Sequence, residues 1–197
     1  MYPDDIDPQS GCRLPLPRRE ELSPEGRRNY DSLADPNGGT LRGLRGPGGI
    51  MLHSEELARL ARPVNQYLRN ESGLEPRLRE LAILATAREL DSQFEWAAHE
   101  PEALRVGVPA DLVETIRHRR PLDAIDPDDA VVVALAREIF TARRVEAATF
   151  ARALALFGRK RLVELVALMG NYAATAALLT AFDMQLDPGQ EPKLPPR

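Results

Sequence analysis

The stretch RLRELAILATARELDSQFEWAAHEPEAL, residues 77–104, decides the fold, because it contains two helical segments joined by one turn. Apolar residues recur three and four positions apart after Pro76, which is the spacing of one face of an α-helix. The chain turns near Asp91 and Ser92, and a second helix is expected from Gln93 to Arg105, before Gly107. The stretch therefore predicts an antiparallel pair of helices.

The rest of the chain is also predicted to be helical. Leu and Ala dominate the apolar residues and aromatic residues make up only 5%, which favours helix over sheet. No stretch alternates between apolar and polar residues as a half-buried strand would. The sequence predicts an all-α protein, with further helices at about 24–33, 55–68, 76–90, 109–118, 127–142, 145–157 and 159–182.

Three segments are expected along the chain of 197 residues. Residues 1–45 form a proline-rich arm and loop with one short helix, which Ser23 caps. Residues 46–186 form the helical domain, and residues 187–197 form a proline-rich tail without a core. The Gly/Pro run at 35–49 lacks the Lys-Ser/Thr pair of a phosphate-binding loop, so phosphate binding is not expected there.

Residues 77–84 (RLRELAIL) and 161–168 (RLVELVAL) are similar to each other. The pairing places Glu164 opposite Glu80 and suggests two related helical units around one core. Shared Leu/Ala-rich composition explains the similarity equally well.

Composition limits the classes of function. A formal net charge of −4 argues against nonspecific nucleic-acid binding, which needs a basic face. The single cysteine, Cys12, excludes an intrachain disulfide and a thiolate zinc site, which favours a reducing compartment. The acidic N-terminal sequence does not resemble an export signal. We therefore expect a cytoplasmic protein.

The uncharged run from Leu165 to Phe182 approaches the length of a membrane span. Gly170, Asn171 and two threonines interrupt it, and no basic residue follows it closely. A helix buried within the protomer or at a subunit contact fits this composition better. We expect no membrane insertion, and self-association of the chain.

Three ionisable residues are expected to converge. Glu95 and His99 lie four residues apart on one face of the second helix, and an antiparallel hairpin brings Glu80 of the first helix beside them. Structural explanations remain open. Ser92 and Glu95 match a capping box, His99 could form a surface ion pair with Glu95, and Glu80 could be a solvated residue.

Two further residues are candidates for binding a substrate. Trp96, the only tryptophan, belongs either to the core or to a binding wall. His53 lies beside a glycine run and either lines a pocket or simply precedes the Ser54 helix cap.

The piece FEWAAHEPEAL, with GPGGIMLHSEEL before it and LVELVALMGNY and AFDM after it, resembles the carboxymuconolactone decarboxylase family, which is related to the alkylhydroperoxidase D-like proteins. The resemblance covers about Gly46 to Asp183. Redox-active members carry Glu, then C-x-x-C, then His. In this chain Ser92 and Glu95 occupy the two cysteine positions, so a dithiol mechanism of peroxide reduction is excluded.

The resemblance implies an alkylhydroperoxidase D-like helical domain that assembles as a trimer or hexamer, with active sites near subunit contacts and no cofactor. It implies a lyase of aromatic compound catabolism that decarboxylates a small carboxylated lactone. In that reaction His99 transfers a proton, Glu80 orients its ring and Glu95 is a base or partner. The substrate would lie against His53, Ser92 and Trp96.

Other interpretations remain open. An isomerase, dehydratase or hydrolase could use the same acid–base residues, and a non-catalytic oligomer could use them as ion pairs. An enzyme predicts a partly enclosed pocket, whereas ion pairs predict scattered or exposed side chains. Glu80, Glu95 and His99 could also supply metal ligands, but nothing in the spacing requires a metal, and we expect none.

Two expectations about charge follow from the same pattern. Two carboxylates beside one imidazole should raise the pKa of His99 above its ordinary value. Arg77 and Arg88 are candidates for binding a substrate carboxylate.

Overall fold

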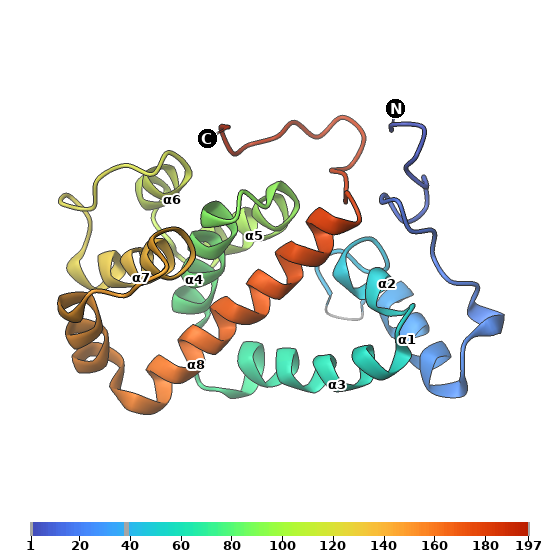
Figure 1. Ribbon diagram of the computed structural model, residues 1–197, viewed down its shortest axis with the longest axis horizontal. Coiled ribbons are helices and arrows are strands. Elements are labelled where there is room, and N and C mark those ends of the chain that lie inside the picture. The colour runs from blue at the N-terminus through green and yellow to red at the C-terminus, as the bar shows by residue number, and fades with distance from the viewer. Residues whose placement is uncertain (1, 38–39, 197) are drawn as a thin grey trace. The chain divides into compact units, whose positions relative to one another are not determined.

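The computed structural model describes residues 2–37 and 40–196. Within these ranges the regular secondary structure is entirely helical (Figure 1), which confirms the all-α fold class. Gly38 and Gly39 of the expected glycine loop, and the two terminal residues, lie outside the described ranges.

The described chain forms two compact units, which consist of residues 1–64 with 177–191 and residues 65–176 with 192–197. These units divide the chain at other places than the three segments expected from the sequence. The difference arises because the N-terminal arm packs with the end of the last helix. The backbone N–H of Arg13 donates to the carbonyl of Phe182, and the N–H of Gln185 donates to Gly11.

The first unit contains the arm, three short helical elements and the start of α3. The hydroxyl of Ser23 accepts a hydrogen bond from the N–H of Gly26 at 3.1 Å, so this residue caps α1 as predicted. Ile6, Cys12 and Leu22 are buried, so the arm contributes to a small core. The elements are η1 (Arg19–Glu21), α1 (Pro24–Ala34), α2 (Pro47–Met51) and α3 (Glu55–Gln66).

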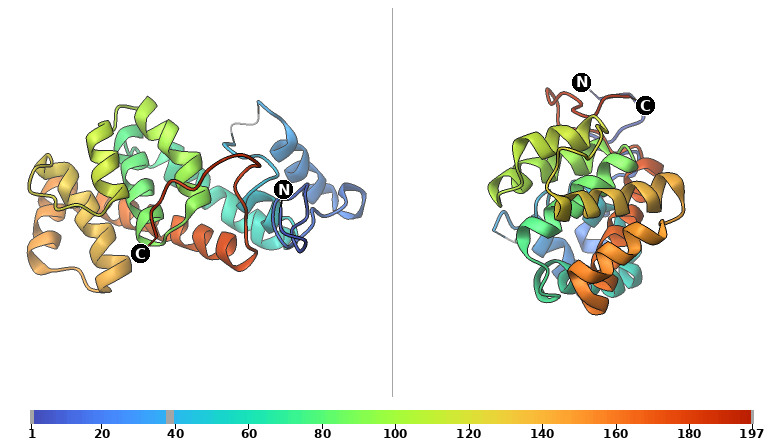
Figure 2. Two further views of the ribbon diagram at one scale, coloured as in Figure 1. Left: turned by 90° about the horizontal axis from the view of Figure 1, so that it is seen from above. Right: turned by 90° about the vertical axis from the view of Figure 1, so that its left-hand side faces the viewer.

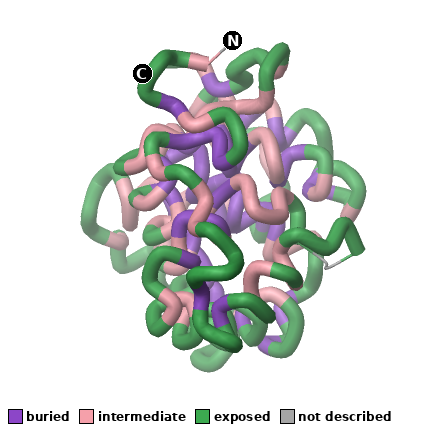
Figure 3. The backbone as a smooth tube through the Cα atoms, turned by 90° about the vertical axis from the view of Figure 1, so that its right-hand side faces the viewer, coloured by how far each residue is buried: buried purple, intermediate pink, exposed green. Residues whose placement is uncertain are grey.

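The second unit is built around α4 (Pro76–Glu89), which packs against α5, α6 and α7. Most of α4 is buried, including Leu81, Ile83 and Leu84, because neighbours cover it on several sides (Figure 2). Figure 3 colours the buried residues of the chain purple. The other elements are the π-helical turn η2 (Tyr67–Glu71), α5 (Gln93–Arg105), α6 (Ala110–Arg117), α7 (Pro127–Arg137), a second π-helical turn η3 (Glu138–Ala142) and α8 (Ala147–Ala181).

Helix α8 joins the two C-terminal helices expected from the sequence. The junction is a kink at Gly158, where φ is 68° and ψ is 172°. By length and composition α8 is a candidate membrane span, yet 44% of its most apolar 18-residue window is buried inside the protein. A core helix of a soluble protein has the same properties, so this finding is weak support for membrane insertion.

The last residues of the chain are more ordered than expected. The side-chain amide oxygen of Gln93 accepts from the N–H groups of Lys193 and Leu194, and its amide nitrogen donates to the Leu194 carbonyl at 2.7 Å. The side chain of Leu194 belongs to the hydrophobic core of the second unit. The expectation of a tail without core contacts is therefore wrong, because a single apolar residue in a proline-rich segment anchors it.

Candidate functional site

The hairpin of α4 and α5 brings Glu80 and His99 into contact. Oε2 of Glu80 lies 2.7 Å from Nδ1 of His99, and both side chains are almost completely buried. Both helices belong to the second unit, so this contact lies within one compact body. The geometry is that of an imidazole oriented by a carboxylate.

Three residues not singled out in the sequence complete the cluster. Nε of Arg79 donates to Oε1 of Glu80 at 3.1 Å, and Nη2 of Arg69 lies 3.8 Å from the same oxygen. The ring of Tyr172 packs edge-on against the His99 ring, with centroids 5.1 Å apart. Its hydroxyl accepts a hydrogen bond from Nη1 of Arg69 at 2.8 Å.

These residues gave little signal in the sequence. Arg79 and Arg69 are two of many arginines, and Tyr172 lies in the uncharged run that suggested only a buried helix. A buried Tyr hydroxyl needs a hydrogen-bond partner, which was the one available signal.

The pKa of His99 is lowered, not raised as expected. Burial disfavours the charged imidazolium and outweighs the Glu80 carboxylate, while the charges of Arg69 and Arg79 act in the same direction as burial. His99 is therefore neutral near pH 7. With Nδ1–H donating to Glu80, its Nε2 carries a lone pair and is a potential base.

Glu80 stays ionised although it is buried. Burial alone would raise the pKa of Glu80, but the contacts with His99, Arg69 and Arg79 together lower it below its ordinary value. The hydrogen bond with His99 is the largest of the effects that lower this pKa, and a neutral imidazole donates it through Nδ1–H. The pair therefore consists of a carboxylate and a neutral imidazole.

The charge state of Glu95 is opposite to that of Glu80. Neither carboxyl oxygen makes a normal hydrogen bond within the described chain, and burial raises the pKa of Glu95 to about 8, a shift that the nearby Ser92 hydroxyl opposes. The carboxyl group is therefore protonated at neutral pH. Burial of the phenol raises the pKa of Tyr172, and so do the charge of Glu80 and, once it ionises, that of Glu95, so Glu95 belongs to the same electrostatic environment.

The expected capping box does not form. Ser92 occupies the N-cap position of α5, but its side chain makes no capping hydrogen bond. The N–H of Ser92, which a capping box would give to Glu95, instead donates to the carbonyl of Ala87 at 2.9 Å. The Glu95 carboxyl is thus left available.

The residues expected to contact a substrate have separate surroundings. Ser92 is buried at the start of α5, and Trp96 lies in the hydrophobic core with the Arg117 guanidinium over its ring. His53 belongs to the first unit, where Nε2 lies 2.8 Å from the Pro15 carbonyl. Ser92, at the N-cap of α5, and Trp96, within α5, therefore share this element with Glu95 and His99, whereas His53 does not.

The two candidate arginines already have carboxylate partners. Arg77 forms a two-pronged ion pair with Asp129 and also donates to the Gly107 carbonyl. Arg88 is buried and pairs with Asp91.

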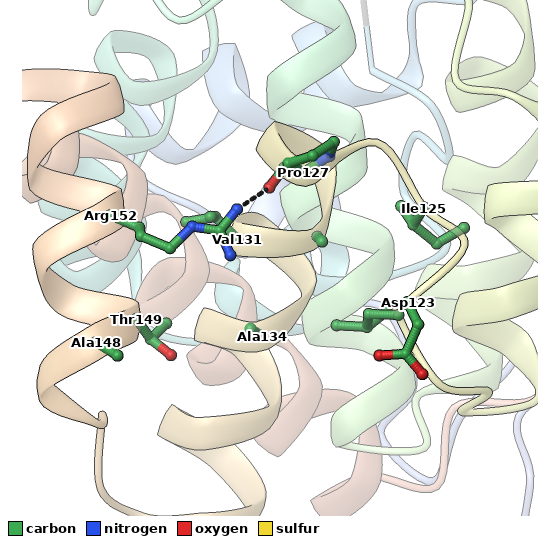
Figure 4. Close-up of a pocket in the computed structure, with 10 residues that line it drawn as sticks. Asp123, Ile125, Pro127, Val131, Ala134, Ala148, Thr149 and Arg152 are labelled. Carbon is green, nitrogen blue, oxygen red and sulfur yellow. Dashed lines mark hydrogen bonds between the residues drawn. The ribbon is translucent and has the colours of Figure 1, made fainter.

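Two cavities of the described structure lie away from the cluster. A cavity of about 380 Å³ lies in the second unit between α7 and the first part of α8, where Arg152 donates to the Pro127 carbonyl (Figure 4). A second cavity lies in the first unit. Glu80, Glu95 and His99 line neither of them. All three side chains are buried, and Glu80 and His99 are in contact, unlike scattered surface ion pairs.

No group of three or more His, Cys, Asp or Glu side chains in the described ranges is arranged to hold a metal ion.

The middle of the chain is similar to a known protein family. Residues 55–138 match the model of the carboxymuconolactone decarboxylase family. The matched segment contains Arg69, Glu80, Glu95 and His99, whereas Tyr172 follows it. No curated protein matches the chain.

Proposed function

We propose that this chain, whose residues 55–138 match the model of the carboxymuconolactone decarboxylase family, is a cofactor-independent acid–base enzyme. Its substrate is a small carboxylated lactone or a related enolisable acid, of the kind met in aromatic compound catabolism. One observation carries the proposal: Glu95 and His99, both buried, lie four residues apart on α5, and Glu80 contacts the His99 ring. Burial favours the neutral imidazole of His99 and the protonated carboxyl group of Glu95. Such a pair is suited to moving protons near neutral pH.

In decarboxylation the bond between the ring carbon and the carboxylate breaks, and its electron pair remains on the carbon. The lactone carbonyl delocalises that pair, and CO₂ leaves. Glu95 in its acid form then protonates the carbon, and a proton from solvent restores the acid. His99, held by Glu80, accepts a hydrogen bond from the reacting group through Nε2.

Isomerisation of an enol-lactone is the second candidate, and the neutral state of His99 favours it. Nε2 of His99 would take a proton from carbon next to the carbonyl, and Glu95 would return one to the far end of the conjugated system. This reaction consumes no proton and releases no CO₂, so the two candidates are distinguishable.

The test is turnover of a muconolactone carboxylate, with released CO₂ and the lactone absorbance followed together. Glu95→Gln and His99→Gln should each lower kcat by ~10²–10⁴-fold, as expected for loss of a general acid or base. Wild-type activity should fall above pH of about 8, as Glu95 ionises. A change in the lactone absorbance without release of CO₂ would support the isomerase instead.

Glu102→Gln is the matched control, because Glu102 lies on the same helix and forms an ion pair with Arg105 at the surface. It should retain wild-type turnover. Wild-type rates in folded Glu95→Gln and His99→Gln proteins would contradict the proposal and leave the cluster a structural one.

We also propose that the enzyme works in the cytoplasm as a homo-oligomer. The single cysteine supports the cytoplasmic location, and the exposed apolar side chains of Val163 and Val166 on α8 support self-association.

A further inference from the structure

Arg69 is the member of the cluster most accessible to solvent. Its side chain is 21% exposed, compared with 12% for Arg79, 7% for His99 and 0% for Glu80. A ligand that reaches the cluster from solvent therefore meets Arg69 with the least displacement of other groups.

The guanidinium of Arg69 also has unused donors. Among the described residues its side chain makes one hydrogen bond, to the Tyr172 hydroxyl, and its approach to Glu80 at 3.8 Å is too long for a second. A guanidinium carries five N–H groups in a planar fork that matches a carboxylate. Arg69 therefore has capacity for a further anionic partner.

The other arginines near the cluster are already in close ion pairs with carboxylates. Arg79 donates to Glu80 and to the backbone carbonyl of Arg69, and Arg77 is paired with Asp129. Arg117 pairs with Glu100 and Glu114.

The backbone around Arg69 supports a functional role. Arg69 lies on the π-helical turn η2, between α3 and α4, and such turns occur frequently at functional sites. The preceding residue, Leu68, is buried, so the turn is anchored while the Arg69 side chain extends to Tyr172. Tyr172 in turn contacts the His99 ring.

We propose that Arg69 binds the substrate carboxylate that is not released as CO₂, and that Tyr172 holds the Arg69 guanidinium in position until the substrate arrives. This inference rests on the proposed acid–base function and names the group that recognises the substrate's charge. The unused N–H groups of Arg69 take the carboxylate, and the hydrogen bond to the Tyr172 hydroxyl keeps the guanidinium beside the His99 ring. Arg69 is thus a specificity residue for carboxylated over neutral lactones.

The test uses paraconate, a saturated γ-lactone with one carboxylate, and its uncharged methyl ester, with affinities measured by isothermal titration calorimetry. The wild type should prefer paraconate. Arg69→Gln should lower the affinity for paraconate by about tenfold to a hundredfold, as expected for a lost charge-assisted pair, and leave the affinity for the ester unchanged. The unchanged ester affinity also shows that the site is folded.

Arg69→Lys keeps the charge but loses the planar fork, so its preference for paraconate should be intermediate. Arg105→Gln, a surface arginine paired with Glu102 on α5, is the matched control and should keep the wild-type preference. A wild-type protein without preference for paraconate, or an Arg69→Gln protein that keeps the preference, would overturn the assignment.

The outcome is separable from that of the proposed function. Binding of paraconate through Arg69 without turnover of any lactone carboxylate would remove the enzyme proposal alone. Turnover with unchanged KM in Arg69→Gln would remove the Arg69 proposal alone, because a lost carboxylate contact should raise KM more than it lowers kcat.

Discussion

Glu80 and Glu95 are both buried glutamates of one helical hairpin, yet their surroundings give them opposite charge states. Arg69 and Arg79 lie beside Glu80 and keep it ionised. Glu95 has no such cation, so burial keeps it protonated up to pH of about 8. The acid and the charged carboxylate are therefore distinguished by their neighbours, which for Glu80 are His99, Arg69 and Arg79, and not by residue type.

The pH dependence of stability should show the state of Glu95. Its pKa in the folded protein, about 8, exceeds the ordinary value of 4.5, so the folded state binds more protons than the unfolded state between these values. The free energy of unfolding should therefore decrease as pH rises from about 5 to 8.5. Each pKa unit corresponds to about 1.4 kcal/mol, and Glu95→Gln should remove this decrease.

Urea unfolding of the wild type and of Glu95→Gln at pH of about 5 and about 8.5 measures this effect. Glu102→Gln is the control, because Glu102 is a glutamate of the same helix that is paired with an exposed arginine. Identical pH dependence in the wild type and Glu95→Gln would show that the carboxyl group is ionised in the folded protein.

At the scale of the helices, α8 depends on one glycine. Gly158 has φ of 68° and ψ of 172°, a conformation essentially restricted to glycine. The helix therefore changes direction there, and residues 159–181 continue with one side against the core that contains Leu165 and Leu168. Tyr172, which contacts His99, belongs to this part of the helix.

Gly158→Ala should destabilise the protein by about 1–3 kcal/mol, because no atom obstructs the new methyl group and the cost is backbone strain alone. Gly170→Ala is the contrasting variant. Gly170 lies inside the same helix without a positive φ and also has open space, so alanine should stabilise by about 0.5–1 kcal/mol. Urea unfolding measures both changes, and equal effects of the two substitutions would refute this interpretation.

At the scale of the whole molecule, the protomer leaves part of α8 uncovered. Val163 is 68% exposed and Val166 39% exposed, and Ala167, Gly170 and Ala174 continue the same face of the helix. Apolar surface of this kind commonly marks a contact with another protein. We propose that this α8 face, residues 163–174, is a contact between copies of the chain.

Light scattering of the wild type at micromolar concentration should give the mass of a trimer or a multiple of it. Val163→Glu should shift the mass toward that of the protomer, because a charge would be buried at the contact. Leu104→Glu, which places the same charge at an exposed apolar position of α5, should leave the mass unchanged. A protomer mass for the wild type would contradict the proposed contact.

The sequence by itself determined the helices and the residues on each face, because these depend on local spacing and on caps such as Ser23. It also placed Glu80 and His99 on facing helices of a hairpin, which the structure shows in contact. Only the tertiary structure decided the charges of the cluster. These charges depend on the desolvation of His99 and Glu95 and on the positions of Arg69, Arg79 and Tyr172. Packing between distant segments sets both the desolvation and the positions, and helical periodicity contains no information about that packing.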